Sequence, residues 1–373
     1  MILRKIDDLI KSDMFSGKAI VIMGARQVGK TTTVRNISGS ADDIVWFNAD
    51  EPDVRDVFAN ITSTRIAQLV GNKKVIVIDE AQRITDIGVK LKLITDCLPD
   101  HQLIVTGSSS FELANMINEP LTGRKWEYTM YPLMFSEMVA HHGLLAEKRA
   151  LPHRLVYGYY PDVVSDANRA ERIVRGLADS YIYKDVLMFD RMKKTDGLMK
   201  MLQAIAFQVG SEVSYNEISQ LCGIDSKTVE KYIGIMEQAF IIFRLPSFSR
   251  NLRNELKKSR KIYFWDNGIR NAVISNFSPI EVRADAGQLF ENFAISERLK
   301  MTHTMQMFRN NWFWRTTAQQ EIDLLEENDG QLSAYEFKYS IHKKARVPLT
   351  FANAYPDAQF SVVSMDNIDE FLL

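Results

Sequence analysis

The most informative segment of this sequence is an eight-residue stretch with two glycines and a final Lys-Thr pair. It runs from Gly24 to Thr31 and reads Gly-Ala-Arg-Gln-Val-Gly-Lys-Thr. The apolar run 19–23 precedes it directly, and a helix is expected to begin within it. A glycine-rich turn between a buried strand and a helix aims several backbone N–H groups at one anion. The spacing therefore predicts a phosphate-binding loop in an α/β fold.

Each residue type in this loop has a chemical reason to be there. Gly24 and Gly29 allow the tight backbone turn. Lys30 supplies a positive charge to the β- and γ-phosphates of a nucleotide, and Thr31 offers a hydroxyl to Mg²⁺. We therefore expect ATP and Mg²⁺ as cofactors. The loop residues expected to contact the nucleotide are Gly24, Ala25, Arg26, Gln27, Val28, Gly29, Lys30, Thr31 and Thr32.

Four further apolar runs follow, separated by segments long enough for helices. They are residues 44–47, 75–78, 103–105 and 126–130. Short, continuously apolar strands that alternate with helices are typical of a parallel sheet covered on both faces. The pattern predicts a nucleotide-binding α/β domain in this part of the chain.

Two acidic residues, Asp79 and Glu80, follow the run that ends at residue 78. The carboxyl ends of parallel strands form the edge at which such sheets bind their ligands. We expect Asp79 to bind Mg²⁺, directly or through water, and Glu80 to act as the base that orients the attacking water. The alternative, a carboxylate that only caps a helix, is less favoured because the phosphate loop lies upstream.

Hydroxyl groups and one arginine complete the candidate nucleotide site. Residues 106–110 read Thr-Gly-Ser-Ser-Ser and end the fourth strand, so Ser108 is a candidate to sense the γ-phosphate or to position water. Equally, these hydroxyls could cap a helix that begins at Phe111. Arg124 is either a surface side chain or an arginine finger that reaches a neighbouring subunit of a homo-oligomer.

Composition excludes several classes of protein. The chain has 373 residues, of which 46% are hydrophobic and 25% charged, as in globular proteins of two or three domains. No apolar run approaches the roughly 20 residues of a membrane-spanning helix. Asp7 and Asp8 lie where a signal peptide needs an apolar core, so we expect a cytoplasmic protein with no membrane partner. Cys97 and Cys222 lack metal-site spacing and are expected to be reduced core thiols.

Residues 195–245 have helical periodicity and include two helices joined by a short turn. Ser214 and Glu217 have the spacing of a capping box, which opens the first helix, and Gly223 ends it. A second helix follows Asp225. Two helices with a short glycine-containing turn predict a helix-turn-helix.

An extended apolar run, 239–244, follows these helices and suits the wing of a winged helix. If the module binds DNA, the second helix faces a groove or the phosphates with Ser226, Lys227, Thr228 and Lys231. The densest cationic stretch of the chain comes next, with Arg250, Arg253, Lys257, Lys258, Arg260 and Lys261. It is suited either to gripping phosphates without sequence specificity or to forming a solvated loop. Nucleic acid, and DNA before RNA, is therefore the expected partner.

Two candidate strands near the C-terminus, 320–326 and 331–339, flank an Asp-Gly pair. Asp-Gly is a preferred centre of a two-residue hairpin turn, so Asn328 is expected opposite Gln331. A three-residue loop would shift this register. Side chains alternate along a strand, which gives the hairpin an apolar face made of Ile322, Leu324, Tyr335 and Phe337.

The other face of this hairpin carries four charged side chains. Asp323 is expected opposite Glu336, and Glu321 opposite Lys338. Two carboxylates that face each other destabilise a sheet unless a cation lies between them. An Asp followed by Glu-x-Lys on the next strand is the PD-(D/E)xK nuclease pattern, in which the carboxylates hold Mg²⁺ and the lysine assists the attacking water. The alternative is a solvent-facing hairpin with a Glu321–Lys338 salt bridge.

Together, these motifs resemble one prokaryotic family of AAA-type P-loop ATPases. The resemblance rests on Asp79-Glu-Ala-Gln82, on Tyr-Pro-Leu-Met-Phe-Ser-Glu at 131–137, on Gly-Tyr-Tyr-Pro-Asp-Val-Val at 158–164 and on Tyr-Phe-Trp-Asp-Asn-Gly at 263–268. In that family the ATPase domain is fused to a C-terminal domain of unknown function with a nuclease-like core. The resemblance implies that Glu291 is a metal ligand beside Asp323 and Glu336.

We therefore expect three domains. They are an AAA-type ATPase domain over 1–150, a helical and winged helix-turn-helix segment over 151–270 and a restriction-endonuclease-like α/β domain over 271–373. The expected function is ATP hydrolysis coupled to DNA engagement, with metal-dependent cleavage at the C-terminal site. The alternative is a regulator or switch without nuclease activity, in which the C-terminal fold only recognises nucleic acid or protein.

Overall fold

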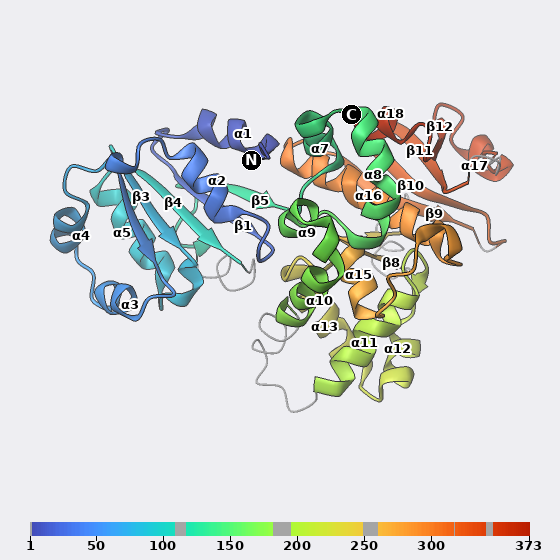
Figure 1. The fold of residues 1–373 in the computed structure, drawn as a ribbon, viewed down its shortest axis with the longest axis horizontal. Helices are drawn as coiled ribbons and strands as arrows, with labels where there is room; N and C mark the ends of the chain where they lie inside the picture. The colour runs from blue at the N-terminus through green and yellow to red at the C-terminus, as the bar shows by residue number, and fades with distance from the viewer. Residues whose placement is uncertain (1, 109–116, 182–194, 249–259, 317, 341–345) are drawn as a thin grey trace. The chain divides into compact units, whose positions relative to one another are not determined.

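The computed structural model describes residues 2–108, 117–181, 195–248, 260–316, 318–340 and 346–373 (Figure 1). The chain divides into two compact units. Unit 1 consists of Met1–Pro132 with Gln238–Phe240, and unit 2 of Leu133–Glu237 with Ile241–Leu373. The segments predicted as the second and third domains share unit 2. No helix within these described ranges is long and apolar enough to cross a membrane.

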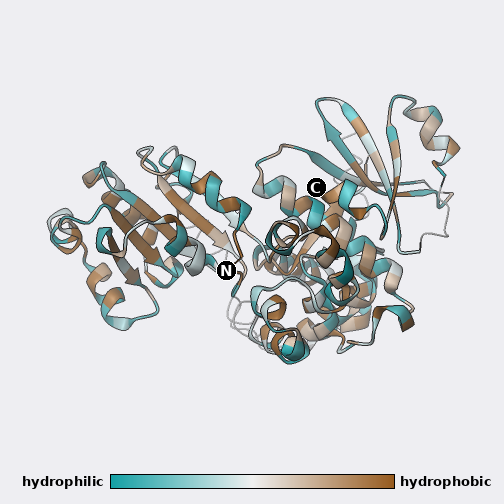
Figure 2. Ribbon diagram, turned by 45° about the horizontal axis from the view of Figure 1, so that its top comes forward, coloured by the Kyte–Doolittle hydropathy of each residue, from teal (hydrophilic) through white to brown (hydrophobic). Residues whose placement is uncertain are grey.

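Unit 1 is built on a five-stranded parallel sheet, as the apolar runs predicted. Its strands are β1 Ala19–Gly24, β2 Ile44–Asn48, β3 Val75–Asp79, β4 Gln102–Gly107 and β5 Lys125–Met130. Their order is β2-β3-β4-β1-β5, and each neighbouring pair is parallel. Every residue of β1, β3 and β4 is buried, and Figure 2 shows these strands in the brown of hydrophobic residues. Strands buried on both faces explain the continuous apolar runs.

Helices cover this sheet. One face, which includes Val21, Ile78 and Val105, packs against apolar residues of three helices. These helices are α3 Pro52–Ala59, α4 Ser63–Val70 and α5 Ile87–Cys97. Two more helices, α1 Lys5–Asp13 and α2 Lys30–Ile37, pack against each other and against strands of the sheet. The prediction that both cysteines are core thiols was wrong, because Cys97 is exposed and Cys222 only half-buried.

Unit 2 begins with a group of helices whose packing depends on two of the sequence motifs. The helices are α7 Phe135–His142, α8 Leu144–Tyr157, α9 Pro161–Ser165, α10 Ala170–Tyr181 and α11 Thr195–Phe207. The Asp266 carboxylate accepts hydrogen bonds from the backbone N–H of Tyr159, at 2.7 Å, and of Ile269, at 3.1 Å. A Cβ at Gly158 would lie 2.1 Å from the Asp266 carboxylate, so only glycine fits there. These motif residues therefore have a structural role.

A small antiparallel sheet and the two predicted helices follow. The elements come in the order α11, β6 Glu212–Val213, α12 Tyr215–Cys222, α13 Ser226–Gln238, β7 Ile242–Pro246 and β8 Arg260–Phe264. The sheet order is β6-β8-β7, so β8 is the central strand. The hydroxyl of Ser214 accepts a hydrogen bond from the Glu217 N–H, and Gly223 ends α12 with φ 65°. The capping residue and the helix stop are where the sequence predicted them.

The C-terminal part of unit 2 contains a four-stranded sheet in the order β12-β11-β10-β9. Its strands are β9 Asn310–Arg315, β10 Glu321–Asn328, β11 Gln331–Lys338 and β12 Gln359–Ser364. Only the β11–β12 pair is parallel. The helices of this region are α15 Asn267–Val273, α16 Ala286–Thr304, α17 Leu349–Ala354 and α18 Ile368–Leu372. Both sheets of unit 2 place residues around α16, which positions the second site described below.

The β10–β11 hairpin has the predicted register over its paired residues, and an irregularity lies on the β9 side of β10. Asn328 pairs with Gln331, and the regular pairing continues to Leu324 opposite Tyr335. On its other side, β10 has an irregularity against β9 between Ile322 and Leu325. Ile322 consequently packs in one cluster with Leu325, whereas Tyr335 contacts Phe371 elsewhere. The prediction that Ile322 shares a face with Tyr335 was wrong because a bulge reverses strict alternation.

Candidate functional site

The phosphate loop joins β1 to α2 at the carboxyl edge of the parallel sheet. Gly24 has φ 155°, and a Cβ there would lie 2.0 Å from the Met130 carbonyl oxygen. Gly29 has φ 98° and is the residue before the first turn of α2. Both positions require glycine, the first for close packing and the second for its backbone conformation. The loop N–H groups and the amino end of α2 thus form a site suited to phosphate.

Lys30 lies folded into its own loop. Its Nζ donates hydrogen bonds to the carbonyl oxygens of Gly24, at 2.8 Å, and Ala25, at 2.7 Å, and the residue is 6% exposed. Carbonyl oxygens are neutral acceptors, so an incoming phosphate oxygen offers the ammonium a stronger partner. Arg4, which the sequence did not single out, lies directly before α1 and contacts the loop. Its guanidinium donates to the carbonyl oxygens of Val28 and Tyr131, each at 2.7 Å.

The predicted magnesium residues lie together. The Thr31 hydroxyl donates a hydrogen bond to Asp79 Oδ2 at 3.1 Å, and the Thr106 hydroxyl donates to Asp79 Oδ1. Asp79 ends β3 and is 8% exposed. A threonine hydroxyl and a carboxylate are the hard oxygen ligands that Mg²⁺ prefers. These residues therefore fit the metal that accompanies ATP.

Glu80 adopts a left-handed conformation, φ 53°, directly after β3. Its N–H donates to the Thr106 hydroxyl at 3.2 Å. The Gln82 side-chain amide donates to Glu80 Oε2 at 2.5 Å and to Ser108 Oγ at 2.9 Å. The other amide atom of Gln82, Oε1, is buried without a hydrogen-bond partner among the described residues. Ser108 therefore lies beside the predicted base, as expected, and Gln82 is a site residue that sequence reasoning missed.

Arg124 lies at the opposite edge of the sheet. Its carbonyl oxygen accepts a hydrogen bond from the Ala19 N–H at the start of β1, whereas the phosphate loop follows the end of β1. Five residues of strand at about 3.3 Å each separate these two edges by roughly 17 Å. The Arg124 side chain is 44% exposed and pairs with Asp96 at 3.0 Å. The structure does not bring Arg124 to the phosphate loop of its own chain, and a role toward a neighbouring chain stays a prediction.

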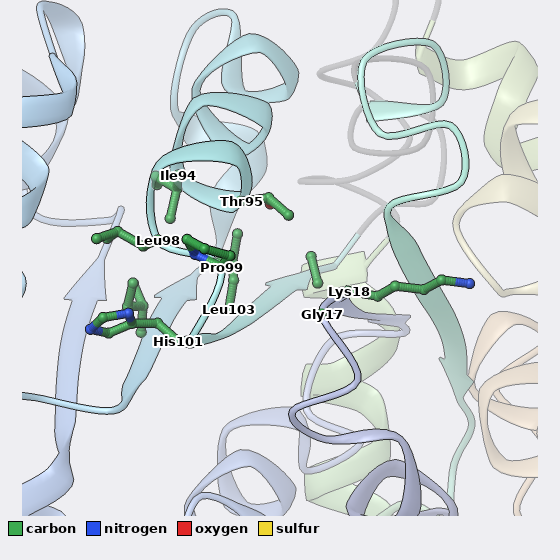
Figure 3. A pocket seen from close by; sticks show the side chains of 10 residues that line it. Gly17, Lys18, Ile94, Thr95, Leu98, Pro99, His101 and Leu103 are labelled. Atoms are coloured by element: carbon green, nitrogen blue, oxygen red, sulfur yellow. The ribbon is translucent and has the colours of Figure 1, made fainter.

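A small pocket also lies at this amino edge (Figure 3). Its lining includes Gly17, Leu98, Pro99 and His101. Figure 3 shows the Lys18 side chain pointing away from His101, and the Lys18 ammonium lies 3.8 Å from the ring centre of Trp126. No predicted site residue lines this pocket, so it adds nothing to the nucleotide site.

A second cluster of charged residues lies in unit 2, where β8, α16 and β10 meet. Lys261 on β8 is 1% exposed. Its Nζ forms an ion pair with Glu321, lies 3.2 Å from a Glu291 oxygen and lies 4.0 Å from an Asp323 oxygen. The Tyr263 hydroxyl donates to the same Glu291 oxygen at 2.7 Å. The predicted residues Glu291 and Asp323 are thus brought together, with an ammonium group that the sequence had placed elsewhere.

The remaining predicted residues of this cluster already have partners. Asp323 Oδ2 accepts a hydrogen bond from the Phe337 N–H at 2.8 Å. The Lys338 ammonium lies 2.5 Å from a Glu336 oxygen rather than beside Glu321, as the alternative salt bridge required. Burial, and then the Glu291 carboxylate, raise the pKa of Asp323 to about 7. Burial, and then Asp323, raise the pKa of Glu336. Burial alone would lower the pKa of Lys261, but the surrounding carboxylates together raise it.

This carboxylate cluster does not fit a divalent metal in the observed conformation. Among the residues that the structure describes, no group of three or more acidic, histidine or cysteine side chains is arranged to hold a metal ion. The Lys261 ammonium lies among Glu291, Glu321 and Asp323, two of which were predicted metal ligands. A cation between Asp323 and Glu336 stays a prediction, whereas the positive charge beside Glu291, Glu321 and Asp323 belongs to a lysine of the same chain.

The candidate nucleic-acid surface is described only in part. Of the cationic stretch, Arg250, Arg253, Lys257 and Lys258 lie outside the described residues. Arg260 lies 4.0 Å from Glu230, and Lys261 is buried in the carboxylate cluster. The prediction that Lys261 belongs to a phosphate-binding surface was therefore wrong, because β8 buries this side chain in the interior of unit 2.

The helix α13 presents a mixed surface. Lys227 and Lys231 are exposed, and so is Glu230 between them. The N–H and the hydroxyl of Thr228 both donate to the Asp225 carboxylate, at 3.0 and 2.5 Å, so these groups of Thr228 already have a partner at the start of the helix.

The serines and helix cap predicted after Ser108 fall in residues 109–116, outside the described part of the chain.

Comparison with known families gives three matches along the chain. Residues 16–139 match an AAA domain, residues 148–280 match the domain of unknown function DUF8612, and residues 286–371 match the domain of unknown function DUF4143. The loop and both acidic residues lie within the first match. The first match supports a P-loop ATPase domain in this part of the chain, and the two other matches assign no activity.

Similar proteins extend over most of the chain. The uncharacterized protein Rv2008c of Mycobacterium tuberculosis is 25% identical over 328 residues, which cover 86% of this chain and 70% of that protein. The uncharacterized protein MJ1544 of Methanocaldococcus jannaschii is 22% identical and covers 85% of this chain and 74% of its own length. A Walker-type ATPase of Pyrococcus abyssi has a similar structure, with a TM-score of 0.51, 14% identity and coverage of 74% of this chain and 96% of that chain. That similarity concerns the fold.

Proposed function

We propose that unit 1 binds ATP with Mg²⁺ and hydrolyses it. The observation that carries this proposal is the hydrogen bond between Thr31 and Asp79. It joins the end of the phosphate loop to the end of β3, and the predicted base Glu80 is the next residue along the chain. Loop, metal residues and base thus meet at one edge of one sheet. The AAA-domain match supports the same conclusion.

The residues have distinct roles in this reaction. Lys30 exchanges its carbonyl partners for phosphate oxygens, and the loop N–H groups hold the β-phosphate. Thr31 and Asp79 would hold Mg²⁺, which would neutralise charge on the transferred phosphate. Glu80 accepts a proton from the attacking water or orients that water. Gln82 holds the Glu80 carboxylate through the 2.5 Å hydrogen bond.

The test is nucleotide binding to the full chain with a single lysine removed. Lys30→Ala is expected to abolish binding of a fluorescent ATP analogue in magnesium buffer and to abolish phosphate release. Lys92→Ala removes an exposed lysine of the same unit and is the control. Equal binding by wild type and Lys30→Ala would refute the assignment of the loop.

We propose a second role in nucleic-acid engagement, carried by the segment from α11 to β8. Its element order and its β6-β8-β7 sheet support a winged helix-turn-helix, with α13 as the helix directed at DNA. Lys227 on α13 is exposed. Lys227→Ala should weaken binding of a labelled duplex and reduce the salt dependence of that binding, whereas Lys92→Ala should not. Salt-independent binding, or none, would exclude this role.

For the C-terminal region we favour recognition without cleavage over a nuclease. The ammonium of Lys261 among the carboxylates supports this choice, because PD-(D/E)xK cleavage needs a metal at that position. Supercoiled plasmid incubated with Mg²⁺ or Mn²⁺ should remain intact with wild-type protein. Nicking by wild type that Asp323→Ala and Glu336→Ala abolish would instead establish the nuclease.

A further inference from the structure

The lysine in the carboxylate cluster differs from an ordinary surface ion pair. Lys261 is 1% exposed, although lysine is among the residues least often found inside proteins. Its carboxylate neighbours come from two elements, Glu291 from α16 and both Glu321 and Asp323 from β10. A buried ammonium is tolerated only where it is paired. The site is therefore built around this one side chain.

The surroundings of Lys261 are shaped for an ammonium group. An ammonium has three donors and no acceptor. Here its Nζ has Glu321 and, at 3.2 Å, Glu291 as partners, and it lies 5.5 Å from the ring centre of Phe313. The Tyr263 hydroxyl holds the Glu291 carboxylate in place at 2.7 Å. Gly210 has φ 76°, and a Cβ there would make a close contact of 3.1 Å with the same carboxylate.

We propose that Lys261 is the resident cation of this carboxylate cluster and that it excludes a divalent metal. The proposal deepens the recognition role proposed above for the C-terminal region. Because Lys261 lies on the central strand of the three-stranded sheet and two of its partners lie on β10, the same charge also ties the two sheets of unit 2 together. No bond is made or broken in this role.

Lys338, the second lysine of the cluster, does not have the role proposed for Lys261. Lys338 is 28% exposed and forms its ion pair with Glu336, so that its charge acts on Asp323 and Glu291 without an ion-pair contact. The lysine of the PD-(D/E)xK pattern is therefore a peripheral member, and the central cation is a residue that the pattern does not include. Removing the Lys261 charge leaves Glu291, Glu321 and Asp323 without their common partner. Oxygen ligands in such a group are then open to a divalent ion.

The experiment measures Mn²⁺ binding to the full-length protein without nucleotide, by electron paramagnetic resonance of free Mn²⁺. Wild type is expected to show no Mn²⁺ binding that depends on Asp323. Lys261→Met keeps the apolar length of the side chain and removes its charge, and it should gain one site at least tenfold tighter than any site in wild type. Adding Asp323→Asn to Lys261→Met should remove the gained site. Lys148→Met removes another ion-paired lysine of unit 2 and should gain nothing.

Two results would overturn the proposal. One is a saturable Mn²⁺ site in wild type that Asp323→Asn removes, which needs no Lys261 variant and so decides the question even if Lys261→Met does not fold. The other is a folded Lys261→Met protein, by circular dichroism, that gains no site. Failure of ATP binding would leave all these measurements unaffected, because no nucleotide is present.

Discussion

Two buried lysines, Lys30 in the phosphate loop and Lys261 in the carboxylate cluster, show how differently one residue type is used in this chain. They are 6% and 1% exposed. Lys30 donates to two backbone carbonyls of its own loop, whereas Lys261 lies among carboxylates that carry full negative charges. A phosphate competes well with carbonyl oxygens and poorly with several carboxylates. The first lysine is thus prepared for a ligand, and the second is already held.

The aspartates of the two sites also differ in whether a ligand can replace their hydrogen-bond partners. Asp79 accepts hydrogen bonds from the hydroxyls of Thr31 and Thr106, which a metal and its waters can replace. Asp323 accepts a backbone N–H of the neighbouring strand, that of Phe337, which belongs to the structure of the hairpin. A motif of carboxylate and lysine therefore indicates a ligand site only when the partners of both groups are exchangeable.

The sharpest test of the first site removes its base. Glu80→Gln should lower the rate of ATP hydrolysis by about 10²- to 10⁴-fold, because the amide cannot accept the proton of water. Nucleotide affinity should be retained, since the loop and Lys30 are intact. Phosphate release and analogue binding measure the two quantities. Glu119→Gln, at an exposed position, is the control. Hydrolysis at the wild-type rate would place the base elsewhere.

Removal of the Lys261 charge should lower the stability of the folded protein. Lys261→Met is expected to lower the free energy of unfolding by about 3 kcal/mol, because it removes the positive charge that Glu291, Glu321 and Asp323 share. Lys148→Met breaks a more exposed pair with Asp369 and should cost about 1 kcal/mol or less. Urea unfolding followed by tryptophan fluorescence reports on unit 2 through Trp265, Trp312 and Trp314. Equal losses in the two variants would show that Lys261 is not a special partner.

The carboxylate cluster also predicts a pH dependence of stability. Burial and Glu291 raise the pKa of Asp323 from 3.8 to about 7, so between these values the folded protein retains a proton that the unfolded chain releases. The contribution of Asp323 to stability is therefore greatest below the lower value, falls as pH rises through this range and levels off above about pH 7. The slope from one such proton is at most about 1.4 kcal/mol per pH unit.

Asp323→Asn should remove this part of the slope. The free energy of unfolding from urea titrations between about pH 5 and pH 8 would then change less steeply in the variant than in wild type. Asp329→Asn, at the exposed hairpin turn, should keep the wild-type slope. A variant slope equal to that of wild type would mean that Asp323 is ionised throughout this range.

The fold of the first unit could be predicted from sequence because its signals are local. Strands buried on both faces produce continuous apolar runs, and the five predicted runs fall within the five observed strands. The spacing from Gly24 to Thr31 is likewise a property of adjacent residues. The hairpin turn at Asp329 was predictable for the same reason, and its pairing near the turn follows from turn geometry.

The second site was only partly predictable because its key contact is not local. Lys261 is 30 positions from Glu291, which lies on α16. It belongs to the three-stranded sheet, whereas Glu321 and Asp323 belong to the four-stranded sheet. In the sequence it stands among basic residues, which suggested a surface, and only the placement of β8 shows that it is buried. The irregularity near Ile322 also has no sequence signal of its own, since strict alternation was the simplest expectation.

The smallest expected effect concerns Gln82, which sharpens the comparison between exchangeable and fixed partners. Its amide N–H groups donate to Glu80 and Ser108, while its buried Oε1 has no hydrogen-bond partner among the described residues. Gln82→Ala should lower the hydrolysis rate by about tenfold, as expected for loss of orientation rather than of the base. Nucleotide affinity should not change.

The control for this last prediction is a double variant. If Gln82 acts through Glu80, adding Gln82→Ala to Glu80→Gln should cause little further loss of hydrolysis, because residues that work as a unit are not additive. A further tenfold loss in the double variant would mean that Gln82 acts on the reacting groups independently of Glu80. Gln82 would then act directly on the reacting groups, and its hydrogen bond to Ser108 would be the one that gives way to them.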